Sequence, residues 1–176
     1  MFGGRSVGAG SLAVLVILVL VLWLGDRSDA PGDDDGSAAE RSGAAASATV
    51  ERVVDGDTIE VDLDGDEEDV RYIGIDTPET VKPDAPVECF GPEASERNHE
   101  LVDGRRVRLV FDRELRDVYG RLLAYVYVGD EFVNGALIAG GYARTLEIEP
   151  NTARAAQLER LQERASAAGR GLWGAC

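Results

Sequence analysis

The sequence contains very little lysine, histidine or cysteine. Of its 18 basic residues, 17 are arginine, and Lys82 and His99 are the single lysine and histidine in 176 residues. Two cysteines do not make the disulfide framework of a small secreted domain, and the shortage of Cys and His leaves little from which to build a zinc site. No collagen-like glycine period is present. These absences leave a globular domain as the expectation.

Negative charge is abundant by contrast. The chain has 33 Asp and Glu residues and a net charge of −15, yet 44% of it is apolar, which is too hydrophobic for a disordered acidic tail. This Asp-rich, Lys-poor composition resembles that of proteins from extreme halophiles, although an ordinary acidic protein is the alternative. Because the Debye length at 1 M salt is only about 3 Å, the acidity does not exclude a nucleic acid as substrate.

The N-terminus carries the longest apolar run. Residues 12–24 are apolar without interruption, and no charge occurs between Arg5 and Asp26. Twenty residues at about 1.5 Å each reach roughly 30 Å, so the segment 1–25 is predicted to be a membrane anchor. Arg5 before it and acidic residues after it favour an extracellular position for the rest of the chain. A cleaved signal peptide, which would give a secreted protein, is the alternative.

The remainder divides into a linker and one domain. Residues 26–47 are mostly Asp, Gly, Ser and Ala with no apolar period, and we interpret them as a disordered acidic tether. The domain is predicted to span residues 48–176.

Apolar patterning within the domain predicts an α+β fold. Three strands form a meander with an Asp64-Gly65 hairpin turn, a helix follows, and two more strands and two helices complete the chain. Asn134 is expected to cap the second helix. The strands are predicted at 50–54, 59–63, 70–75, 107–111 and 122–128, and the helices at 92–102, 134–140 and 152–168. Five strands with helices after the third and fifth fit a small OB-fold β-barrel.

Five short motifs, taken together and in order, resemble those of the staphylococcal nuclease (thermonuclease) family. They are VDGDT at 54–58, VRYIGIDTPE at 70–79, FGPEA at 90–94, YGRLLAY at 119–125 and VNGAL at 133–137. The resemblance covers roughly residues 48–173. It implies an OB-fold barrel with three helices that hydrolyses phosphodiester bonds of DNA and RNA, usually with Ca²⁺, and we expect a monomer.

The resemblance also implies a role for individual residues. Asp57 and Asp76 correspond to carboxylate ligands of the metal, and Thr77 to a ligand through its backbone carbonyl. Arg71 and Arg121 correspond to the pair that grips the scissile phosphate. Glu79 corresponds to the general base that acts through a water molecule, and Tyr119 to an aromatic residue bordering the nucleotide pocket.

Elementary chemistry asks for the same residue types. Hydrolysis of a phosphodiester builds negative charge on the phosphorus oxygens, and a guanidinium pairs with two such oxygens while staying protonated. A hard cation such as Ca²⁺ prefers carboxylate, carbonyl and water oxygens, and Mg²⁺ or Mn²⁺ could replace it. Taken singly, each residue could instead be an ordinary turn or surface residue, and a noncatalytic nucleic-acid-binding module of the same fold is the alternative function.

Cys89 and Cys176 are the two thiols of the chain. A domain outside the membrane would lie where disulfides persist, so we predict a bond between the loop that holds Cys89 and the C-terminal tail. Two free thiols are the alternative.

Overall fold

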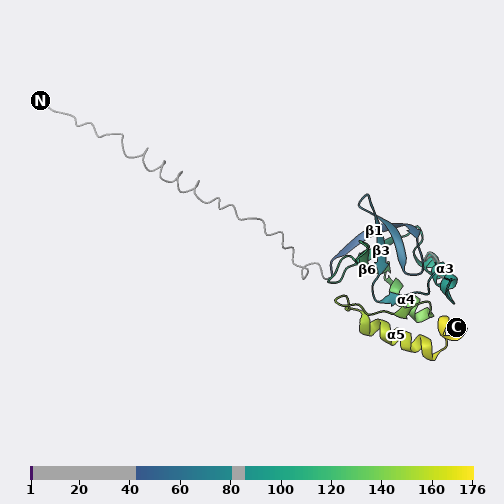
Figure 1. The fold of residues 1–176 in the computed structure, drawn as a ribbon. Coiled ribbons are helices and arrows are strands. Elements are labelled where there is room, and N and C mark those ends of the chain that lie inside the picture. The colour runs from purple at the N-terminus through teal and green to yellow at the C-terminus, as the bar shows by residue number, and fades with distance from the viewer. Residues whose placement is uncertain (2–42, 81–85) are drawn as a thin grey trace. The chain divides into compact units, whose positions relative to one another are not determined.

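The computed structural model describes Met1 and residues 43–80 and 86–176 (Figure 1). Five strands form a closed barrel: β1 (Ala45–Val53), β2 (Thr58–Leu63), β3 (Asp66–Tyr72), β5 (Arg106–Val110) and β6 (Leu122–Val128). β1, β2 and β3 are an antiparallel meander, β5 pairs with β1 and β6, and a parallel pairing between β3 and β6 closes the barrel. The predicted five-stranded OB-like barrel is confirmed.

The barrel is closed around an apolar core. Side chains that alternate along the strands point inward, because successive residues of a strand face opposite sides. Ile59, Val61, Val70 and Leu109 are fully buried in this way. Helix α3 (Gly91–Val102) adds Leu101 and Val102 to the same core.

Two further helices lie together below the barrel in Figure 1. They are α4 (Val133–Gly140) and α5 (Ala155–Ala167), and a short helix α6 (Leu172–Ala175) follows. The sequence did not predict α6 or the two-residue strands β4 (Ile75–Asp76), β7 (Glu131–Phe132) and β8 (Arg144–Thr145), of which β4 pairs with β8. Elements this short carry no recognisable period.

Three expectations need correction. Asn134 does not cap α4: Phe132 occupies the N-cap position, and the buried Asn134 side chain binds backbone groups of the barrel instead. The predicted strand 70–75 is divided by a turn at Ile73-Gly74, where Gly74 has a φ of 79°. β1 begins at Ala45, inside the predicted linker, because residues 45–49 pair with β5 despite their small side chains.

The other parts of the N-terminal predictions lie outside the described residues. The apolar run at 12–24 and the stretch 26–42 belong to the undescribed segment. Among the residues that the structure describes, no helix is long and apolar enough to cross a bilayer.

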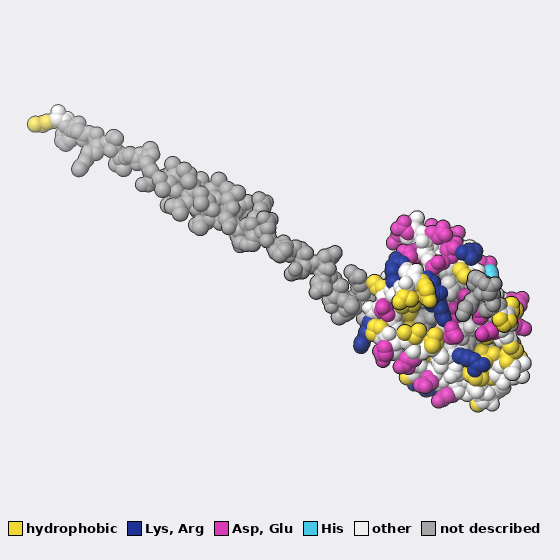
Figure 2. Space-filling model, in the orientation of Figure 1, with side chains coloured by type: hydrophobic (Ala, Val, Ile, Leu, Met, Phe, Trp, Pro, Cys, Tyr) yellow, Lys and Arg dark blue, Asp and Glu magenta, His cyan; other side chains and the backbone are white. Residues whose placement is uncertain are grey.

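Acidic side chains crowd the surface of the barrel domain (Figure 2). The tip of the β2–β3 hairpin is an example, because Asp62, Asp64, Asp66 and Glu67 are all exposed there. Charges this exposed are well solvated.

A disulfide joins Cys89, two residues before α3, to Cys176, the residue directly after α6, with a sequence separation of 87 and a Cα–Cα distance of 6.1 Å. A crosslink that closes so long a loop removes conformational entropy from the unfolded chain, by about 4 to 5 kcal/mol in the chain-entropy model.

We therefore predict that the double variant Cys89→Ser/Cys176→Ser loses up to about 4 kcal/mol of unfolding free energy, measured by urea denaturation. Adding a reducing agent should lower the stability of the wild type toward that of the variant and leave the variant unchanged. Equal denaturation midpoints for oxidised wild type and variant would contradict the prediction.

Candidate active site

The turn between β1 and β2 carries Asp57 into the interior. Its backbone N–H donates to Asp55 Oδ1 at 3.0 Å, and its carbonyl accepts the N–H of Tyr72 at 3.0 Å. Gly56 lets this turn approach Thr77, because a Cβ at position 56 would lie only 2.7 Å from the Thr77 side chain. The Asp57 carboxylate is thus held against the segment that follows β4.

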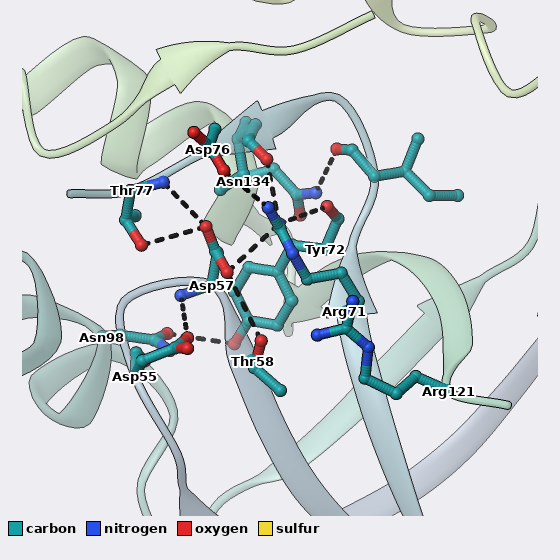
Figure 3. Close-up of polar contacts among 12 residues, drawn as sticks. Asp55, Asp57, Thr58, Arg71, Tyr72, Asp76, Thr77, Asn98, Arg121 and Asn134 are labelled. Carbon is teal, nitrogen blue, oxygen red and sulfur yellow. Dashed lines mark hydrogen bonds and ion pairs between the residues drawn. The ribbon is translucent and has the colours of Figure 1, made fainter. Parts of the chain in front are cut away.

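Both oxygens of the Asp57 carboxylate are engaged (Figure 3). Oδ2 accepts the backbone N–H of Thr77 at 2.7 Å and its hydroxyl at 2.9 Å, whereas Oδ1 lies 3.1 Å from Arg71 Nη1. The side chain is only 6% exposed. Burial raises the pKa of Asp57 to about 6, although Arg71 and the Thr77 donors oppose the rise. A charged carboxylate here needs compensation by positive charge.

Arg71, on β3, supplies part of that charge and links two acidic residues. Its Nη2 lies 2.9 Å from Asp76 Oδ1 on β4, while its Nη1 contacts Asp57 and donates to the carbonyls of Tyr72 and Ile75. The Asp76 side chain is 57% exposed. One guanidinium therefore brings two carboxylates, 19 positions apart in the sequence, to the same place.

Two buried asparagines hold the segments that carry these acids. Asn98 of α3 donates to the carbonyl of Asp55 at 2.9 Å and accepts the Tyr72 hydroxyl at 3.0 Å. Asn134 of α4 accepts the Val126 N–H and donates to the carbonyl of Ile73, both at 2.9 Å. Sequence reasoning missed both roles; a polar residue on the buried face of a helix was the available signal.

Arg121 approaches from the start of β6. Its Nε donates to Asp117 Oδ2 at 2.7 Å, and its guanidinium carbon lies 5.5 Å from the centre of the Tyr119 ring. Among the described residues, its two terminal nitrogens form no hydrogen bond or ion pair. Asp117, which sequence reasoning also missed, thus fixes Arg121 while leaving its outer edge for a ligand.

Arg71 and Arg121 line one cavity of about 360 Å³. Its other walls are largely apolar and include the exposed side chains of Val118, Tyr119 and Ile148. Two guanidinium groups beside an apolar and aromatic surface suit a ligand with both an anionic and a planar part.

Glu79 lies in the loop that follows β4. It follows Asp76 by three residues, its Oε1 accepts the Thr80 N–H at 2.9 Å, and its own N–H donates to Glu88 at 3.2 Å. It is not among the residues that line the 360 Å³ cavity. The structure therefore brings together four of the predicted residues, Asp57, Arg71, Asp76 and Thr77. Arg121 and Tyr119 line the cavity that Arg71 also lines, and Glu79 does not.

The oxygen atoms at this place fit a hard cation. The carboxylates of Asp57 and Asp76 both contact Arg71, and the backbone N–H of Thr77 donates to Asp57; in the described part of the chain, no thiol or imidazole is among these contacts. Within residues 43–80 and 86–176, no three Asp, Glu, His or Cys side chains form a complete metal-binding group. An ion here would thus need the Thr77 carbonyl, water or a ligand to complete its coordination.

Comparisons with known proteins show which family the chain belongs to. The family model described as staphylococcal nuclease homologue matches residues 69–175. The thermonuclease of Staphylococcus intermedius is 38% identical over 169 residues, which are 96% of this chain and 98% of that protein. The thermonuclease of Staphylococcus hyicus is 44% identical over 69% of this chain and 72% of its own length. Endonuclease YncB of Bacillus subtilis is 49% identical over 59% of this chain and 50% of its own length.

The environment of Asp117 gives a pH-dependent prediction. Partial burial raises the pKa of Asp117, but N–H donors from Arg121 and Tyr119 outweigh it and hold the pKa below the usual value. Asp117 therefore stabilises the fold above pH of about 4, where the unfolded carboxyl is ionised, and this stabilisation is lost as pH falls through the lowered folded pKa.

We expect Asp117→Asn to lower the unfolding free energy at pH 7 by about 1 to 2 kcal/mol, with the deficit shrinking below pH of about 4. Urea denaturation from pH 3 to pH 7 measures it, with Asp66→Asn at the exposed hairpin tip as control. A deficit that stays constant down to pH 3 would show that the ionised carboxylate is not responsible.

Proposed function

The chain belongs to the staphylococcal nuclease family and is a phosphodiester-hydrolysing nuclease, and we propose that it cleaves DNA and RNA with little sequence specificity and with Ca²⁺ as cofactor. The observation that carries the proposal is the cavity lined by Arg71 and Arg121 next to the paired carboxylates of Asp57 and Asp76. Positive charge for a phosphate and oxygen ligands for a cation meet there.

The two arginines have different tasks in this proposal. Arg121, anchored through Nε, presents both terminal nitrogens to one phosphate, as a bidentate contact requires. Arg71 reaches the same cavity while it orients the carboxylates. Together they stabilise the negative charge that grows on the phosphoryl oxygens during attack.

Asp57, Asp76 and the carbonyl of Thr77 would hold the cation. A bound divalent ion would supply Lewis-acid polarisation of the phosphate and a more acidic water. The buried Asp57 carboxylate favours such a partner, because its burial in ionised form is costly without nearby positive charge. Mg²⁺ and Mn²⁺ share the preference for oxygen ligands and are alternatives to Ca²⁺.

Glu79 would accept the proton of the attacking water. Its loop position keeps it within three residues of Asp76, and the Thr80 N–H fixes one of its oxygens. A carboxylate is a weak base, so the proton transfer depends on a water made more acidic nearby.

The surface around the cavity suits a polymer more than a small ester. Tyr119 is 82% exposed and Val118 93%, and an exposed aromatic ring can stack on any base, whatever the sequence. We propose that the enzyme acts as a monomer outside the cell, anchored through residues 1–25 or secreted after their removal.

The test is cleavage of single-stranded DNA and RNA by the full chain at high salt, with Ca²⁺ or with a chelator. We expect cleavage only with the metal. Arg71→Lys and Glu79→Gln should each lower the rate by about a hundred- to ten-thousand-fold, because the first removes a planar two-pronged donor and the second a base.

Arg97→Lys is the matched control, since Arg97 pairs with Glu100 on α3 and lines neither the cavity nor the carboxylate pair. Binding of both nucleic acids without cleavage would instead support the noncatalytic OB-fold module. Unchanged rates in both site variants would refute the assignment of these residues.

A further inference from the structure

Strand β4 contributes one residue to the first cavity and one to a second, smaller cavity. It has a volume of about 200 Å³, and Asp76, Thr77, Glu88 and Arg144 are among the residues that line it. Ile75 lines the larger cavity and Asp76 the smaller one, as expected for successive residues of a strand that face opposite sides. Asp76, which lines the smaller cavity, forms its ion pair with Arg71, which lines the larger one, and this pair links the two cavities.

Arg144 is the cross-strand partner of Asp76 in the β4–β8 pair. Its guanidinium carbon lies 4.4 Å from the centre of the Trp173 ring, and within the described residues no carboxylate lies within 4.0 Å of its nitrogens. The ring holds the guanidinium by its face, so the N–H groups at its edge remain available for hydrogen bonds. In a chain of net charge −15, an arginine kept beside an aromatic ring rather than an acid is poised for an anion from outside.

The rest of the smaller cavity limits what that anion can be. Of the side chains that line it, all in the described part of the chain, Arg144 alone is positively charged, and Asp76 and Glu88 are acidic. The charge of Asp76 is offset by Arg71, and Glu88 accepts the Glu79 N–H. A small free anion would bind weakly here, because a single cation attracts it while two acids lie nearby. A phosphate that is part of a longer bound chain is held in this cavity by the other contacts of that chain.

We propose that Arg144 binds a second phosphodiester of the substrate strand, next to the one that is cleaved, so that the strand crosses Asp76 and occupies both cavities. This inference rests on the proposed nuclease function and assigns Arg144 to substrate binding. The larger cavity, with its apolar and aromatic walls, takes a base and sugar, and the smaller, polar cavity takes the neighbouring phosphate.

The proposal makes the effect of Arg144 depend on substrate length. A dinucleotide with one phosphodiester reaches only Arg71 and Arg121, whereas a twelve-nucleotide strand also reaches Arg144. We expect Arg144→Gln to lower kcat/KM for the twelve-mer by about ten- to a hundred-fold, mainly by raising KM. The kcat/KM for the dinucleotide should stay within about two-fold of the wild-type value. Arg144→Lys, which keeps the charge, should recover part of the loss.

Arg97→Gln is the control, because it changes the net charge equally and lies outside both cavities. Equal losses on the two substrates, or a twelve-mer value equal to that of Arg97→Gln, would overturn the proposal. Thermal unfolding of each variant shows whether it is folded. If Arg144→Gln is misfolded, Trp173→Leu replaces it, because this variant removes the aromatic ring and keeps the arginine. We expect Trp173→Leu to weaken cleavage of the twelve-mer and not that of the dinucleotide.

Binding separates this inference from the nuclease assignment. If the wild type cleaves neither substrate, the proposed function fails, but fluorescence anisotropy of a labelled twelve-mer still tests Arg144. The slope of log affinity against log salt should be smaller by about 0.7 in Arg144→Gln than in Arg97→Gln, as for the loss of one single-strand phosphate contact. Identical slopes would overturn the role of Arg144 alone.

Discussion

The guanidinium of Arg71, placed between the carboxylates of Asp57 and Asp76, is the interaction on which the site depends. The same side chain donates to the carbonyls of Tyr72 and Ile75, so it also fixes the turn that leads from β3 to β4. Removing one partner from a buried charge pair typically costs about 3 to 5 kcal/mol, because the other charge stays buried without compensation. The site and the local fold are consequently built from the same contacts, and a substitution at Arg71 affects both.

The chain uses one residue type, arginine, for quite different purposes, and the partner decides which. Arg116 gives both terminal nitrogens to Glu68, so its charge is compensated by an acidic neighbour. Arg121 is held by Asp117 through Nε alone, and Arg144 by the face of Trp173. Because the protein is strongly acidic, arginines without a full set of acidic partners mark the places where an anionic substrate can compete for them.

Patterns of period two, the Asp64-Gly65 turn and the helix of residues 92–102 were enough to predict the barrel, because local preference and burial agree there. The contacts within the active site were harder to predict from the sequence. The motifs pointed to Asp57, Arg71, Asp76 and Arg121, but nothing in their spacing showed that Arg71 joins both acids, or that Asp117 holds Arg121. Asn134 was expected to cap a helix and instead binds Val126 on β6 and Ile73, which lies 61 positions away in the turn after β3. The contact between Asn134 and Ile73, and the link that Arg71 makes between Asp57 and Asp76, join segments that meet only in the folded barrel, so local sequence patterns do not predict them.

The claim that acids and guanidinium groups from separate segments form one metal-assisted phosphate site is tested most directly by diffraction. Crystals of the wild-type protein soaked in Mn²⁺, under conditions in which Mn²⁺ supports cleavage, would be examined for anomalous scattering from the metal. We predict a single strong peak in contact with carboxylate oxygens of Asp57 and Asp76 and with the carbonyl of Thr77. A peak elsewhere on the domain, with none at these oxygens, would contradict the account.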